Sequence, residues 1–184
     1  MSNAMEILNL LDSLLKSPAE IVLYGRAALL LGFDKPPLEF ALSRDVDVVL
    51  HTGQAEALLE KGDFWQAVER VNELLADKGL YIAHFFTEDQ VVLRPDWRKL
   101  RERINGPWSN LKVFRLADID LFLSKLMRYD PIDIKDALFI ISRANLSLRD
   151  ITYAIKAARV PDIPEIKEQV ELMSNKILAS FTDE

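Results

Sequence analysis

One short stretch of alternating residues constrains this chain more than any other. From Asp45 to Leu50 the order is Asp-Val-Asp-Val-Val-Leu, so acidic and apolar side chains alternate at its start. A period of two is typical of a β-strand, because successive side chains point to opposite sides of a sheet. We therefore predict a strand in which Val46, Val48 and Leu50 face a core while Asp45 and Asp47 share the other face.

Two carboxylates on the same face of a strand repel each other. On an ideal strand Asp45 and Asp47 lie about 7 Å apart. A divalent cation that prefers oxygen ligands would relieve this repulsion. The alternative is an edge strand with a solvated acidic face, and an isolated Asp-x-Asp pair by itself favours that alternative.

A second feature lies upstream of the acidic strand. Residues 21–24 have the character of a short buried strand, Gly25 follows directly, and a helix rich in small and apolar residues begins at Arg26. A strand, a glycine turn and a helix N-terminus in this order can bind phosphate through backbone N–H groups and the helix dipole. Any tight strand-to-helix turn can also use a single glycine.

The remaining periodicities predict an α+β fold of the mixed α/β kind. Helical spacing covers residues 5–16, 53–62 and 64–77, and strand patterns cover 80–86, 90–93 and 111–116, with the first two of these strands forming a hairpin. Four helices follow, at about 118–129, 132–144, 147–158 and 164–181. We expect a small mixed β-sheet with helices packed on it and a helical C-terminal bundle.

This pattern also predicts how the chain is organised. Residues 1–4 resemble an expression-tag remnant, and we set them aside. Residues 5–116 would form the α/β core, and residues 117–184 a helical region packed on that core in a single structural unit.

Composition limits the partners of the protein. Its net charge of −6 argues against broad attraction to nucleic acid or to an anionic membrane. The chain has no cysteine, which excludes disulfides, thiolate zinc sites and a cysteine nucleophile and favours a cytoplasmic location. No apolar run is long enough to span a bilayer, so we expect no membrane partner.

A local basic segment is the exception to this acidic character. Its cations alternate with aromatic residues, which could form a platform for a base or a nucleic-acid strand. A solvated helix face is the default interpretation. The residues are Arg94, Arg98, Lys99, Arg101 and Arg103, near Trp97 and Trp108.

The order of these features resembles the nucleotidyltransferase superfamily of the DNA polymerase β type. The resemblance is to the small bacterial group related to the AbiEii toxins and minimal nucleotidyltransferases. It is carried by Gly25-Arg26, by Ser43-Arg44-Asp45-Val46-Asp47, by Lys125 in a late helix and by the following Asp133-Ile134-Lys135-Asp136. No single motif is diagnostic; their order and spacing are.

The resemblance implies a nucleotidyltransferase that uses Mg²⁺ and a nucleoside triphosphate. Asp45 and Asp47 would be the catalytic and metal-binding residues, transferring a nucleotide to a hydroxyl on RNA, protein or a small molecule. The same family pattern implies nucleotide or phosphate contacts for Gly25, Arg26, Ser43, Arg44 and Lys125. It also implies a possible toxin-like role with a cognate partner protein.

Two departures from the family pattern keep an alternative open. Arg26 stands where the family has glycine or serine, and no third carboxylate lies on a neighbouring strand; Glu88 and Asp89, in a turn, are the nearest substitutes. The alternative is a nucleotidyltransferase-fold protein that binds or regulates without catalysis.

We expect His84 to be a hydrogen-bonded core or sheet histidine, because it alternates with Ile82 and Phe86. For the enzyme interpretation to hold, Gly25, the acid pair Asp45 and Asp47, and Lys125 must converge on a single cleft that can bind a metal-bound triphosphate.

Overall fold

The computed structural model describes residues 2–60 and 62–181. The chain divides into two compact units, one of Met1–Thr87 with Arg101–Arg115 and one of Glu88–Leu100 with Leu116–Glu184. The predicted α+β class is confirmed, because a mixed sheet and numerous helices are present. Within the described ranges, no helix has the length and apolar character needed to cross a membrane.

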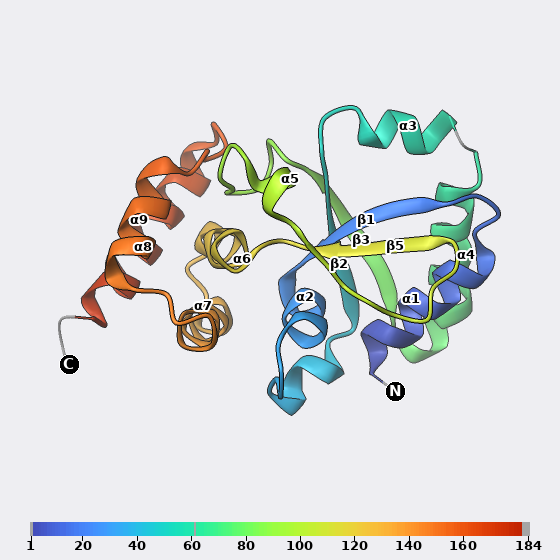
Figure 1. Ribbon diagram of the computed structural model, residues 1–184, viewed down its shortest axis with the longest axis horizontal. Coiled ribbons are helices and arrows are strands. Elements are labelled where there is room, and N and C mark those ends of the chain that lie inside the picture. Colours follow the sequence, from blue (N-terminus) through green and yellow to red (C-terminus); the bar gives the residue numbers. More distant parts are fainter. Residues whose placement is uncertain (1, 61, 182–184) are drawn as a thin grey trace. The chain divides into compact units, whose positions relative to one another are not determined.

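A five-stranded mixed sheet with the strand order β3-β2-β1-β5-β4 forms the first unit. The inner strands β1 and β2 are antiparallel, β3 runs parallel to β2, and β4 is antiparallel to β5. β5 runs parallel to β1, and Figure 1 shows these two strands side by side. The strands are β1 (Ala19–Tyr24), β2 (Asp45–Leu50), β3 (Tyr81–Thr87), β4 (Glu102–Arg103) and β5 (Leu111–Arg115). The acidic strand is therefore an inner strand of the sheet, with neighbours on both sides.

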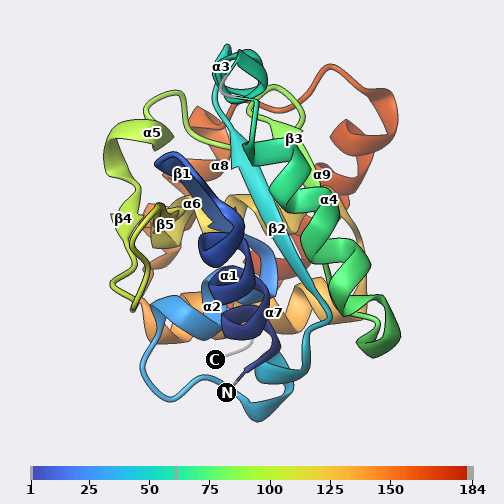
Figure 2. The same ribbon diagram turned by 90° about the vertical axis from the view of Figure 1, so that its right-hand side faces the viewer.

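Helices of the first unit bury the apolar side of this sheet. Figure 2 shows α1 (Asn3–Leu14) and α4 (Phe64–Leu75) side by side in front of the strands. Val46 and Val48 are buried, as the alternation predicted, whereas Asp45 and Asp47 are only half-buried. The other helical segments of this unit are α2 (Gly25–Gly32), η1 (Leu38–Leu42), α3 (Gln54–Glu60) and η2 (Ala76–Lys78).

The second unit is helical, as predicted for the C-terminal region. Asp130 caps α7 by accepting a 2.7 Å hydrogen bond from the backbone N–H of Ile132, and Ser147 and Asp150 form a capping box at the start of α8. Both helices begin within one residue of the predicted starts at 132 and 147, since α7 begins at Pro131 and α8 at Leu148. The segments are α5 (Trp97–Leu100), α6 (Asp118–Ser124), η3 (Lys125–Met127), α7 (Pro131–Arg143), α8 (Leu148–Ala157) and α9 (Pro164–Ala179).

The predicted hairpin is wrong. β3 pairs in parallel with β2, and residues 90–93 contribute only an isolated bridge between Leu93 and Arg159 among the described pairings. The apolar run at these positions is buried without being a strand. A buried run of this length does not by itself distinguish a strand from other buried backbone.

The first helix begins earlier than expected. Asn3 and Ala4 are its first residues, Ala4 is buried, and the Ser2 hydroxyl accepts a 3.3 Å hydrogen bond from the backbone N–H of Met5. Three of the residues that we set aside as a tag remnant thus belong to α1 or cap it.

Candidate metal centre

Three side chains with metal-ligand chemistry converge on one face of the sheet. Asp45 and Asp47 come from β2, and His84 comes from the neighbouring strand β3. One ligand atom from each residue lies within 4.8 Å of the others. Two carboxylates and one imidazole are therefore close enough for a single ion to contact all three.

A β-bulge in β3 brings His84 into this group. Asp47 pairs with Ala83 and the next residue, Val48, pairs with Phe85, so His84 is the extra residue of the bulge. Its φ angle of 52° lies in the left-handed region, which a non-glycine residue rarely adopts. The bulge lets the His84 ring reach the acidic face, where its Nδ1–H donates a 2.9 Å hydrogen bond to Oδ1 of Asp47.

Neighbouring side chains hold two of the three groups in position. The Ser43 hydroxyl donates a 2.9 Å hydrogen bond to Oδ1 of Asp45. The His84 ring stacks on Phe86 with ring centroids 5.8 Å apart and an interplanar angle of 5°, and Phe86 meets Tyr24 edge to face. Such contacts restrict side-chain rotation, so the donor set is partly preorganised.

Gly25 adjoins Asp47 at the end of β1. The φ angle of Gly25 is 68°, and a Cβ at this position would overlap Oδ2 of Asp47. Tyr24, the preceding residue, pairs with Asp47 in the β1–β2 ladder. Since α2 begins at Gly25, the positive end of its dipole lies beside a carboxylate, which is a favourable arrangement.

Of the other residues predicted to contact phosphate in the first unit, Ser43 lies at the carboxylates and Arg26 contacts η1. The Arg26 guanidinium is 3.8 Å from Oε1 of Glu39 and lies 5.2 Å above the ring of Phe40. Arg44 is exposed, and its carbonyl accepts a 3.0 Å hydrogen bond from the backbone N–H of Tyr81, which joins the start of β2 to β3.

Lys125 lies in the second unit, where two aspartates hold its ammonium group. Nζ is 3.1 Å from Oδ1 of Asp133 and 2.8 Å from Oδ2 of Asp136, and all three side chains are buried. Arg128 makes a further 2.8 Å contact with Asp133. The lysine and the Asp-x-x-Asp pair of the predicted motif therefore form one buried ion cluster within this unit.

Glu88, a substitute for the missing third carboxylate, also has partners in the second unit. Its carboxylate accepts a 2.9 Å hydrogen bond from the Trp97 indole, and Arg159 lies 3.3 Å from the same oxygen. His84 is a hydrogen-bonded sheet histidine, as expected, and its ring also lies beside the acid pair, where it could supply a third ligand. The sequence offered one signal for it, a histidine on the strand that follows the acidic one.

Several side chains of the basic segment have partners within the protein. Trp97 is buried, so its ring offers no exposed stacking surface. The Arg94 guanidinium donates hydrogen bonds of 2.7 to 3.2 Å to both carboxylate oxygens of buried Asp120. Burial alone would lower the pKa of Arg94, but the hydrogen bond and the charge of Asp120 outweigh burial and raise this pKa. In the first unit, Arg101 pairs with Glu20 at 2.7 Å and lies over Phe114.

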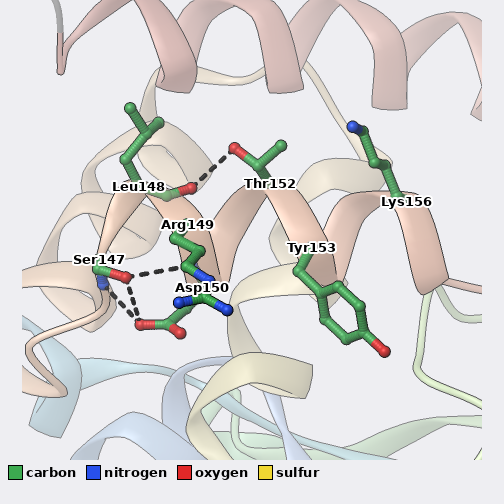
Figure 3. A pocket seen from close by; sticks show the side chains of 7 residues that line it. All are labelled: Ser147, Leu148, Arg149, Asp150, Thr152, Tyr153 and Lys156. Atoms are coloured by element: carbon green, nitrogen blue, oxygen red, sulfur yellow. Dashed lines mark hydrogen bonds between the residues drawn. The ribbon is translucent and has the colours of Figure 1, made fainter.

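A surface hollow lies along α8 in the second unit. Figure 3 shows that the polar groups at its N-terminal end bond to one another: Ser147 and Asp150 form the capping box, and the Thr152 hydroxyl donates to the carbonyl of Leu148 at 2.7 Å. The side-chain hydrogen bond from Ser147 lowers the pKa of Asp150. This arrangement accounts for Ser147 and Asp150 as parts of a helix cap and for the Thr152 hydroxyl as bonded within α8.

Comparisons with protein-family models, with curated proteins and with solved structures found no match for this chain.

Proposed function

We propose that the protein is a metal-dependent nucleotidyltransferase whose centre is the group Asp45, Asp47 and His84. The observation that carries this proposal is the convergence of these three donors within 4.8 Å beside Gly25, at the start of a helix. The choice of nucleotidyl transfer rests on the resemblance of the sequence motifs.

The residues present fit a divalent cation. Carboxylate oxygens bind hard divalent ions, and a neutral imidazole is a common ligand of borderline ones. A bound ion would supply neutralisation of triphosphate charge and activation of a hydroxyl acceptor. In this proposal Ser43 orients Asp45, while Gly25 lets the backbone at the start of α2 come close to a phosphate.

The proposed reaction is transfer of a nucleotide from a nucleoside triphosphate to a hydroxyl, with Mg²⁺ as the ion that the family resemblance implies. The acceptor would be RNA, a protein or a small molecule in the cytoplasm. A toxin-like role with a cognate partner protein belongs to the same proposal.

Thermal melting tests the binding part of this proposal. The parent, Asp47→Asn and a control, Asp34→Asn, would be melted with a divalent ion and each of the four nucleoside triphosphates. Asp34 is exposed and lies outside the donor group. A ligand that binds only the folded state raises the melting temperature, so we expect a shift in the parent and the control that Asp47→Asn loses.

Transfer of labelled nucleotide to candidate acceptors would then test turnover. Unchanged melting curves with every nucleotide would contradict the enzyme proposal.

One observation favours a second candidate function, a non-catalytic binding or regulatory protein. The resemblance assigns Lys125 to the triphosphate, yet its ammonium lies between two buried carboxylates. A lysine held between two buried carboxylates contributes to the stability of the fold. Binding of a nucleotide without transfer to any acceptor would support this second function.

A further inference from the structure

The third donor of the candidate centre is the imidazole nitrogen of His84. A nitrogen donor affects which ion the centre binds. We propose that His84 makes the centre selective for a divalent transition metal ion that accepts imidazole, represented by Mn²⁺ and Zn²⁺, over Mg²⁺. This inference rests on the proposed function, because it concerns the ion bound by the same group, and it replaces the Mg²⁺ that the family resemblance implies.

The spacing of two donors suits a shared ion. Nδ1 of His84 and Oδ1 of Asp47 are 2.9 Å apart. Two ligands at right angles around an ion with bonds of about 2.1 Å lie about 3 Å apart. An ion bound by both atoms would take the place of the proton that now joins them, with little movement of either side chain.

Ligand chemistry sets the selectivity. Mg²⁺ binds oxygen donors almost exclusively and gives up its water reluctantly, so an imidazole contributes little to its affinity. Zn²⁺ and several other first-row transition metal ions bind imidazole well and also accept carboxylates, and Mn²⁺, which favours oxygen ligands, accepts imidazole more readily than Mg²⁺ does. A centre of two carboxylates and one imidazole therefore gains affinity for the second class of ion from its third ligand.

The backbone at His84 separates the role of the ring from the role of the bulge. Glycine is the residue that adopts a φ of 52° without strain, and the His84 side chain is 52% exposed. His84→Gly should therefore keep the bulge and the fold while removing the nitrogen donor. His84→Asp offers an oxygen donor at the same position.

The test measures Mn²⁺ and Mg²⁺ binding to the parent, His84→Gly, His84→Asp and Asp47→Asn. Free Mn²⁺ would be followed by its electron paramagnetic resonance signal, and Mg²⁺ would be added as a competitor. Pulsed measurements on bound Mn²⁺ would detect coupling to a ¹⁴N nucleus. Zn²⁺ competition would be measured in the same way.

We expect ¹⁴N coupling in the parent and its loss in both His84 variants. The preference for Mn²⁺ over Mg²⁺ should fall about tenfold or more in His84→Asp, because the nitrogen ligand is exchanged for oxygen. Binding that needs Asp47 but shows no ¹⁴N coupling, or an unchanged preference in His84→Asp, would overturn this inference and leave the proposed function standing. Absence of any Asp47-dependent ion binding would overturn both.

Discussion

The backbone of Gly25 lies against the carboxylate of Asp47, so closely that a Cβ at position 25 would overlap Oδ2. The glycine has a positive φ of 68° as well, so both its conformation and its surroundings disfavour a side chain. This relationship ties the start of α2 to the acid pair of β2, the two sequence features from which the candidate centre was first predicted.

Gly25→Ala should therefore destabilise the protein and weaken ion binding. A left-handed conformation costs an L-residue about 1–2 kcal/mol, and the new methyl group would also displace Asp47 from its place beside His84. Chemical denaturation and Mn²⁺ binding would measure the two effects separately.

Gly79→Ala is the matched control for this substitution. Gly79 has a φ of 64°, and a Cβ there would meet nothing within 4 Å. Gly79→Ala should lower stability through the strain of a positive φ alone, and it should leave ion binding unchanged. Equal ion binding in Gly25→Ala and Gly79→Ala would contradict the close approach of Gly25 to Asp47.

How far the centre could be predicted from sequence depends on the residue. The alternation from Asp45 to Leu50 predicted both the strand and the shared face of the acids, because a regular strand has a fixed period. Gly25 was predicted to join a strand to a helix, and it is the first residue of α2, directly after β1.

His84 was not predicted as a member of the candidate centre because a bulge changes the period within one strand. Alternation placed it with Ile82 and Phe86, but the extra residue between Ala83 and Phe85 shifts the register. Left-handed backbone is usually signalled by glycine or asparagine, and position 84 has neither.

The predicted strand at residues 90–93 is absent because a buried apolar run has no period that identifies it as a strand or shows which segment it packs against.

Lys125→Met should destabilise the second unit strongly. The substitution leaves Asp133 and Asp136 buried near each other without their shared cation, and removing one partner of a buried ion pair costs about 3–5 kcal/mol. Urea denaturation followed by circular dichroism would measure the loss.

Lys135→Met is the control on the same group of helices. Lys135 is exposed on α7, so its substitution should change stability by no more than about 0.5 kcal/mol. If Lys125→Met and Lys135→Met were equally stable, the buried cluster of Lys125, Asp133 and Asp136 would not stabilise the second unit as its contacts indicate.

Asp63 should make stability depend on pH in the acidic range. It precedes α4, but its carboxylate bonds to the Ser17 hydroxyl at 2.7 Å and to the backbone N–H groups of Lys16 and Ser17 rather than to its own helix. The hydrogen bond from the Ser17 hydroxyl, followed by the one from Lys16, lowers the pKa of Asp63.

A lowered folded-state pKa contributes stability above the unfolded-state pKa of about 3.9, and this contribution is lost as the pH falls through the folded-state value. The parent should therefore lose stability more steeply than Asp63→Asn below about pH 4. Denaturation series at several pH values would measure the slopes. Parallel slopes for the two proteins would show that the Ser17 contact does not affect titration of Asp63.

The central claim is that Asp45, Asp47 and His84 hold a divalent ion, and counting bound Mn²⁺ by equilibrium dialysis tests it most directly. The comparison would use the parent, the double variant Asp45→Asn with Asp47→Asn, and a control with Asp34→Asn and Asp89→Asn, two exposed aspartates outside the group. We predict saturable binding in the parent and the control that the Asp45 and Asp47 variant lacks. Equal binding by all three proteins, or none by any of them, would contradict the claim.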